Sequence, residues 1–316
     1  MMKQLVYSSV ALGTLLAGAA QAADIAIGVP NWPSAKAGAA VLKALAEEEF
    51  GANVTMVPGT NPVIFAAMAG GKGDIDIHPE VWLPNQQNLV DEYSESVAVG
   101  EPMFQGEQGL CMTEQGSEML GVSAVSELGD PEIAAKLDSD GDGQGEIWVG
   151  APGWFSTNVE KVKMRDYGLA ELYEPEVIDE TLAYARIEEK ENKGEPYVFY
   201  CYTPHHIFAQ YDLVMLEEPP YDEAKWTMVQ PDEDPQWMEK SSVSTGWKPA
   251  DIQLAYSRSL EERAPEVLTL LQNFKPTNDI VADWTYQMVV EGKDETQVAE
   301  EWIAQNREIV DKWLGL

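Results

Sequence analysis

The chain has 316 residues, of which 54 are acidic and 20 are basic, and its formal net charge is −34. A protein that binds nucleic acid needs Lys and Arg to neutralise phosphates, so this composition argues against a nucleic-acid partner. Most of the acidic side chains are expected to form a solvated surface on a soluble protein.

The first 22 residues have the features of a secretory signal peptide. Lys3 supplies a positive start, residues 5–19 are mainly apolar, and Ala20-Gln21-Ala22 is a small-x-small cleavage site. The apolar run is too short to span a bilayer, and no later stretch of the sequence is long and apolar enough to do so. We therefore expect residues 1–22 to be cleaved off near Ala22 and the protein to be exported to the periplasm.

The N-terminal part alternates strand-like and helix-like segments. Residues 25–29, 54–57 and 74–77 have the apolar or alternating character of strands. Helices are expected to start at Ser34 and at Asn61-Pro62. This order predicts an α/β fold with a mostly parallel sheet, whose ligands bind beyond the carboxyl ends of the strands.

A second set of elements follows, and the length allows two ordinary domains or one large one. Strands are expected at residues 108–113, 147–150 and 197–202, and a helix is expected at residues 158–167. Residues 217–250 are rich in Pro, Trp and acidic residues and should be irregular. The chain closes with helices, the last from Thr296, in which Trp284, Trp302 and Trp313 are expected to pack.

Three of the ten tryptophans stand beside Pro or Gly at the ends of predicted strands. They are Trp32 in Asn-Trp-Pro, Trp82 before Leu-Pro, and Trp154 after Pro-Gly. Indole rings in such places line clefts, and their electron-rich faces attract quaternary ammonium groups. The sequence therefore predicts an aromatic cleft for a methylated amine.

Four motifs occur in a fixed order along the chain: GVPNW at residues 28–32, DIDIHPEVWLP at 74–84, GAPGW at 150–154 and YTPHHIFAQYDL at 202–213. Together they resemble the glycine betaine/proline betaine substrate-binding proteins of ABC importers. The resemblance implies a two-lobed, type II-like periplasmic-binding-protein fold, in which each lobe is a mixed sheet flanked by helices. The ligand then lies in the cleft between the lobes, which close on it by hinge motion.

Under this resemblance, residues 24–108 and 213–316 form lobe I, and residues 109–212 form lobe II. The implied function is solute capture in the periplasm by a monomer, which delivers its ligand to an inner-membrane ABC permease and is not an enzyme.

The resemblance also implies a box of aromatic rings around a trimethylammonium group. Trp82 and Trp154 match box tryptophans of the family, and Tyr202 stands where the family usually has Trp before Thr-Pro. Trp32 in the first loop is expected to close another side. His205, from the His205-His206 pair, is expected to line the cleft, with the other histidine exposed.

Departures from the family pattern bear on the ligand. Gln86 stands where some relatives place a His that holds the betaine carboxylate, and no Arg or Lys accompanies the motifs. Glu80 should face the cleft, where it would repel a ligand carboxylate or, when protonated, donate to an N-oxide. We therefore place trimethylamine N-oxide slightly ahead of glycine betaine, with choline, proline betaine and dimethylsulfoniopropionate as alternatives.

Residues 138–146 (DSDGDGQGE) match the first part of an EF-hand loop, with acids at positions 1, 3, 5 and 9 and Gly at position 6. The acid at position 12 is missing, since Val149 stands there. The alternative is an acidic turn without metal. We expect a structural Ca²⁺ site whose ligands are Asp138, Asp140, Asp142, Gln144 and Glu146.

Cys111 and Cys201 both lie in predicted strands, where they either form the one possible disulfide or remain buried thiols. Catalytic motifs are lacking in the sequence: it has no Ser-His-Asp set, phosphate loop or H-E-x-x-H motif. The rival function from another class is a secreted hydrolase of choline-like esters. That enzyme would need a nucleophile beside a base, which the sequence does not reveal.

Overall fold

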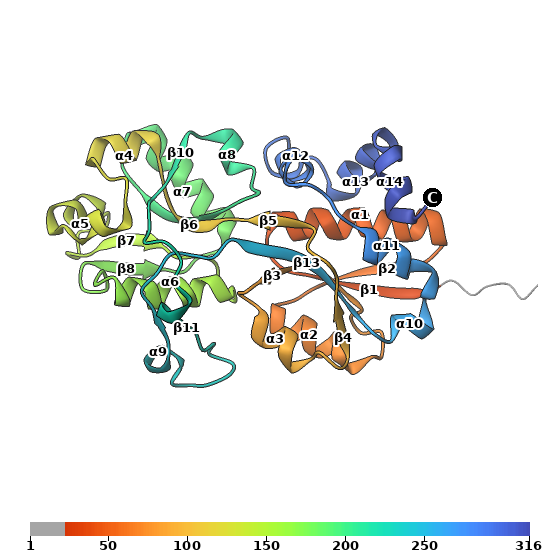
Figure 1. The fold of residues 1–316 in the computed structure, drawn as a ribbon. Coiled ribbons are helices and arrows are strands. Elements are labelled where there is room, and N and C mark those ends of the chain that lie inside the picture. Colours follow the sequence, from red (N-terminus) through yellow and green to blue (C-terminus); the bar gives the residue numbers. More distant parts are fainter. Residues whose placement is uncertain (1–22) are drawn as a thin grey trace, which may run out of the picture.

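Residues 23–316 are described by the computed structural model, and they form two α/β lobes that lie side by side (Figure 1). The signal peptide expected at residues 1–22 lies outside the described residues. Among residues 23–316, no helix combines the length and the apolar character needed to cross a bilayer.

Lobe I is built on a mixed sheet of order β2-β1-β3-β13-β4, with β5 also paired to β13. The strands are β1 (Asp24–Val29), β2 (Asn53–Pro58), β3 (Ile77–Leu83), β4 (Val97–Val99), β5 (Phe104–Gly106) and β13 (Ala250–Ser257). β1 is parallel to β2 and β3, whereas β13 runs antiparallel to its partners.

Helices cover both faces of this sheet (Figure 1). The helices of lobe I are α1 (Pro33–Phe50), α2 (Asn61–Gly70), α3 (Gln87–Glu92), α10 (Leu260–Arg263), η3 (Pro265–Val267), α11 (Leu268–Asn273), α12 (Asn278–Val289), α13 (Glu295–Gln305) and α14 (Arg307–Leu314). On one face α1 packs against α12 and α13, and on the other face α2 lies against β3, β4 and β13.

Lobe II is built on a sheet of order β10-β6-β9-β7-β8. Its strands are β6 (Gln108–Thr113), β7 (Gly145–Trp148), β8 (Tyr173–Glu176), β9 (Val198–Tyr202) and β10 (Leu213–Met215), and β11 (Trp226–Thr227) pairs with β12 (Ser242–Val243). Its helices are α4 (Glu114–Leu120), η1 (Val125–Gly129), α5 (Pro131–Leu137), α6 (Phe155–Asp166), α7 (Glu180–Lys193), α8 (Ile207–Gln210), η2 (Glu223–Lys225) and α9 (Trp237–Lys240).

The chain passes between the lobes twice. Only Glu107 separates β5 of the first sheet from β6 of the second. The chain returns along residues 216–249, where β12 packs on α6, and it re-enters the first sheet at β13. The return that we expected at residue 213 therefore comes later, because Leu213–Met215 pairs with β6 in the second sheet.

The predicted elements are largely in place, with informative shifts. The strand expected at residues 74–77 lies instead at Ile77–Leu83, so Trp82 is inside a strand and not in a loop. The first helix begins at Pro33 with Trp32 as its N-cap, because the Ser34 hydroxyl donates to Glu80 instead of capping the helix. The final helix is interrupted at Asn306.

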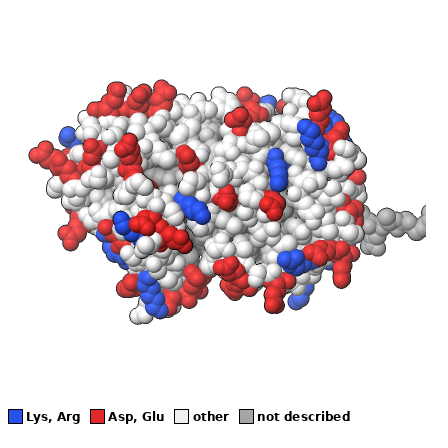
Figure 2. All heavy atoms as spheres, viewed as in Figure 1, with Lys and Arg blue, Asp and Glu red and all other residues white. Residues whose placement is uncertain are grey.

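The C-terminal tryptophans are packed in the core and the surface is acidic, as the sequence predicts (Figure 2). Trp302 contacts Trp284 edge-on and stacks on Trp313, with ring centroids 5.0 and 5.3 Å apart, which confirms these three as core residues. Figure 2 shows acidic side chains spread over both lobes on the face in view, with few basic ones between them.

The two cysteines form a disulfide between neighbouring strands of lobe II. Cys111 lies on β6 and Cys201 on β9, and their Cα atoms are 5.8 Å apart. Of the two alternatives, a disulfide or two buried thiols, the structure contains the disulfide.

Replacing both cysteines by Ser should lower the free energy of unfolding by about 2–4 kcal/mol, because the cross-link restricts a long loop of the unfolded chain. Urea denaturation of the double variant and the wild-type protein, each under oxidising conditions, measures this difference. The wild-type protein with reductant is the control, and equal stabilities of variant and oxidised wild type would contradict the expectation.

Candidate ligand-binding site

A pocket lies where the two lobes meet, and the space in and directly around it that protein atoms do not fill, open solvent included, is about 360 Å³. The residues that line it are Trp32, Asn61, Trp82, Asn85, Gln86, Gln108, Trp154, Phe155, Ser156, Tyr200 and Tyr202. The first five belong to lobe I and the others to lobe II. Among the described residues, those that line the pocket carry aromatic, amide and hydroxyl groups, and none of them is charged.

Four of the lining rings meet nearly at right angles. The ring of Tyr202 stands at 90° to Trp82 and at 82° to Trp154, with centroid distances of 5.4 and 5.9 Å. The ring of Trp32 stands at 89° to Trp154, 6.2 Å away. We call Trp32, Trp82, Trp154 and Tyr202 the aromatic box.

Each ring of the aromatic box is held at the carboxyl end of a strand or in the turn that follows. Trp32 caps α1 after β1, and Trp154 caps α6 after β7. Trp82 lies near the end of β3, and Tyr202 is the last residue of β9. The α/β topology thus brings together four positions that are far apart in the sequence.

In lobe I, a buried carboxylate holds two of the rings. Glu80 Oε1 accepts hydrogen bonds from Nε1 of Trp32 and Nε1 of Trp82, both at 2.8 Å, and from Ser34 Oγ at 2.7 Å. Burial raises the pKa of Glu80 to about 7, although these three hydrogen bonds oppose the rise. Glu80 was expected to face the cleft, but it is not among the lining residues and holds the two rings from behind.

Lobe II has a matching carboxylate that the sequence did not reveal. Glu180 Oε1 accepts from the hydroxyls of Tyr202 at 2.8 Å and Tyr184 at 3.1 Å. Burial, followed by the Glu180 charge, raises the pKa of Tyr202 well above its usual value, so the phenol stays protonated as a donor. Glu180 is the first residue of α7 and belongs to no motif, so no sequence signal connects it with Tyr202.

Both members of the histidine pair are buried, which corrects the expectation that one is exposed. The His205 ring packs edge-on behind Tyr202, with centroids 4.8 Å apart, and its Nε2 lies 3.3 Å from Glu180 Oε1. His205 is therefore one layer behind the pocket and not on its wall. Burial lowers the pKa of His206 to about 3, so this ring is neutral.

Polar groups of the pocket form specific pairs. Gln108 Oε1 accepts from Asn85 Nδ2 at 2.6 Å and from the Tyr200 hydroxyl at 2.8 Å. Gln86 differs, because its Oε1 is buried and has no hydrogen-bond partner within the described chain. Trp154 Nε1 donates to Asn31 Oδ1 at 2.7 Å, which links a box ring of lobe II to lobe I.

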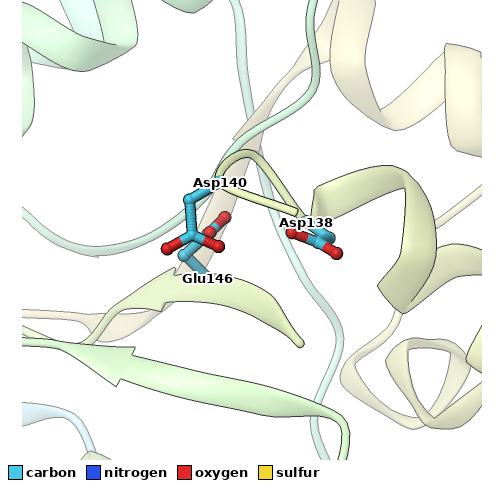
Figure 3. Close-up of side chains that lie close together, drawn as sticks. All are labelled: Asp138, Asp140 and Glu146. Carbon is cyan, nitrogen blue, oxygen red and sulfur yellow. The ribbon is translucent and has the colours of Figure 1, made fainter. Parts of the chain in front are cut away.

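The acidic loop between α5 and β7 brings three carboxylates together (Figure 3). One oxygen from each of Asp138, Asp140 and Glu146 lies within 4.8 Å of the others. The Asp142 carboxylate is not part of this group. The Asp142 carboxylate accepts from the backbone N–H of Gln144, whose side-chain amide donates to a backbone carbonyl.

Residues 23–305 match the sequence family described as the substrate binding domain of ABC-type glycine betaine transport systems. A glycine betaine/proline betaine-binding periplasmic protein of Salmonella typhimurium is 24% identical over 100 residues, which cover 32% of this chain and 30% of that protein. Its Escherichia coli counterpart is 22% identical over 159 residues, 46% of this chain and 47% of that protein. The chain thus spans less than half the length of the curated relatives it matches.

Solved structures are similar over most of the chain. A glycine betaine/L-proline-binding protein from Borrelia burgdorferi has a TM-score of 0.71 at 19% identity, covering 92% of this chain and 96% of that one. A lactococcal protein in a closed conformation with glycine betaine has a TM-score of 0.70 at 19% identity, covering 92% and 99%. A choline-binding protein with choline has a TM-score of 0.71 at 20% identity, covering 92% of this chain and 91% of that one. The likeness confirms the expected two-lobed periplasmic-binding-protein fold.

The raised pKa of Glu80 predicts a specific pH dependence of stability. As pH rises from about 4.5 to about 7, the unfolded chain releases the Glu80 proton while the folded chain keeps it, so folding becomes less favourable. Relative to a Glu80→Gln variant, the wild-type free energy of unfolding should fall by about 3 kcal/mol across this window. Urea denaturation of both proteins at several pH values tests this, and parallel pH profiles would rule it out.

Proposed function

The chain belongs to the family of substrate-binding domains of ABC-type glycine betaine transport systems, and we propose that it captures a small methylated amine in the aromatic box. The observation that carries the proposal is the perpendicular set of four rings around a pocket without charged lining. We further propose that the protein acts as a monomer in the periplasm and delivers its ligand to an inner-membrane ABC permease.

The physics of the box supports a methylated ammonium group. Its methyl groups spread positive charge over an apolar surface, which fits against electron-rich ring faces without needing a hydrogen-bond acceptor. A desolvated ring contributes about 1–2 kcal/mol, so three or four rings together with apolar burial are enough for about micromolar affinity.

We propose trimethylamine N-oxide as the first ligand and glycine betaine as the second. No cationic side chain of the pocket wall is available to pair with a ligand carboxylate. The carboxyl groups of Glu80 and Glu180 lie directly behind the rings, where their ionised forms favour a cationic head and disfavour an additional anionic group. A compact N-oxide needs only a few donors, and Gln86, whose Oε1 has no hydrogen-bond partner within the described chain, can turn its NH₂ toward it.

Hydrolysis of a choline-like ester is poorly supported by the same pocket. Its wall has one aliphatic hydroxyl, Ser156, and no histidine or carboxylate that could serve as a base beside it. A family of substrate-binding domains likewise fits capture without reaction.

Replacing Trp82 or Trp154 by Ala should weaken binding of trimethylamine N-oxide and glycine betaine by about tenfold or more, because each change removes one ring face. Titration calorimetry with these ligands, choline, proline betaine and dimethylsulfoniopropionate ranks the candidates. Trp226→Ala is the matched control, since Trp226 packs on Trp247 outside the pocket. The proposal fails if the wild-type protein binds none of the five below about millimolar.

We also propose a structural Ca²⁺ ion at the acidic loop. Three clustered carboxylates suit a hard cation that prefers oxygen ligands. The Asp138 oxygens accept from backbone N–H groups of Gly141 and Gly143, at 2.6 and 2.9 Å, and these bonds shape the loop. A carboxylate has about four lone-pair sites, so these bonds leave room for a metal.

Calcium in large excess over its dissociation constant should raise the melting temperature by about 5 °C relative to the chelator-treated protein. Differential scanning calorimetry measures this shift. In an Asp138→Asn/Asp140→Asn variant the shift should disappear while methylated-amine affinity is unchanged, because the loop shares no residue with the pocket. An identical shift in this variant would place the calcium effect elsewhere.

A further inference from the structure

We propose that Asn61 anchors the anionic oxygen of the ligand, and that buried His78 fixes the Asn61 amide with its NH₂ group turned to the pocket. The site then selects methylated amines that carry a negatively charged oxygen over choline-like alcohols. This inference rests on the proposed function, because it assigns a second contact to a ligand held by the aromatic box.

Strand β3 is irregular where it pairs with β13. Val81 pairs with Gln253 and His78 pairs with Ala255, so two residues of β3, Pro79 and Glu80, stand opposite a single residue of β13. An extra residue in a strand leaves the ladder locally unpaired. The backbone N–H of Glu80 donates to Nδ1 of His78 at 3.2 Å.

This hydrogen bond determines the tautomer of His78. Because Nδ1 accepts a hydrogen bond from this N–H, it carries no hydrogen, and the ring hydrogen of the neutral imidazole must be on Nε2. Burial lowers the pKa of His78 to about 3, so the ring stays neutral at physiological pH. Nε2 lies 3.0 Å from Asn61 Oδ1 and therefore donates to it.

The hydrogen bond from His78 fixes the orientation of the Asn61 amide at the pocket. Its Oδ1 is occupied by His78, so the group that remains is the Nδ2 amide, a donor without a partner among residues 23–316. Asn61 is buried and lines the pocket, on the lobe I side. It is the first residue of α2, whose positive end adds to the attraction for negative charge.

A donor held in this way distinguishes ligands by their oxygen. An N-oxide or carboxylate oxygen carries negative charge and makes a charge-assisted hydrogen bond, which is stronger than one to a neutral hydroxyl. A ligand without oxygen leaves the buried donor unpaired, at a cost to binding. The aromatic box thus recognises the methylated head of the ligand, and Asn61 recognises the anionic oxygen attached to that head.

The test is an exchange of this donor for an acceptor. In Asn61→Asp, a carboxylate oxygen can still accept from His78, but the pocket then faces a negative acceptor. We expect affinity for trimethylamine N-oxide and glycine betaine to fall by about 50-fold or more, while choline, whose hydroxyl can donate, binds equally well or better. Titration calorimetry with these three ligands and tetramethylammonium measures the ratios.

Asn85→Asp is the matched control, because it makes the same charge change at a lining amide whose Nδ2 is already paired with Gln108. It should alter the ligand ratios much less than Asn61→Asp does. If Asn61→Asp unfolds, Asn61→Ala replaces it. Binding of trimethylamine N-oxide and glycine betaine should then weaken by about tenfold, while tetramethylammonium binds equally well or better because no unpaired donor is left.

An equal loss of all ligands in Asn61→Asp, or an unchanged ratio in Asn61→Ala, overturns the assignment. A wild-type protein that binds none of the ligands refutes the proposed function instead. The tautomer is checked separately by nitrogen NMR, which is practical because the chain has only 3 histidines. A proton on Nδ1 of His78 in the folded protein would also overturn the inference.

Discussion

The aromatic box depends on two buried carboxylates, Glu80 in lobe I and Glu180 in lobe II. Indole N–H and phenol O–H groups lose water when the rings are buried, and each then needs an acceptor. Glu80 supplies that acceptor for Trp32 and Trp82, and Glu180 supplies it for Tyr202. The polar edges of the rings therefore point away from the pocket, and the ring faces are left for the ligand.

Because each carboxylate serves rings of its own lobe, the two halves of the box are built separately. They meet at the start of α6, where three consecutive residues have different tasks. Trp154 is a wall of the box and donates to Asn31 of lobe I, whereas Ser156 lines the pocket. Phe155 packs into the apolar cluster around Ile64 and Phe65 of lobe I. Contact between the lobes and completion of the box thus occur together.

The sequence was sufficient for the fold class and for the rings, but not for the groups that hold the rings. Tryptophans beside turn signals and an α/β rhythm are local patterns, and both predict where the box forms. Glu80 was expected on the pocket wall because its strand was placed at residues 74–77, several residues too early. Glu180 and the histidine pair act through contacts between α7 and the end of β9, which no local pattern encodes.

The contacts of Asn61 could not be predicted from the sequence either. Asn61 precedes a proline at the start of a helix, so in the sequence it looks like a residue with a purely local structural role. His78, which contacts it in the structure, looks like an isolated histidine. Only the irregular pairing of β3 with β13 reveals that one backbone N–H orients His78, and that His78 in turn orients Asn61. In the assignment proposed for Asn61, specificity comes from the direction of a hydrogen bond rather than from charge on the pocket wall. The carboxyl groups of Glu80 and Glu180 lie one layer behind the wall, where they accept hydrogen bonds from the rings.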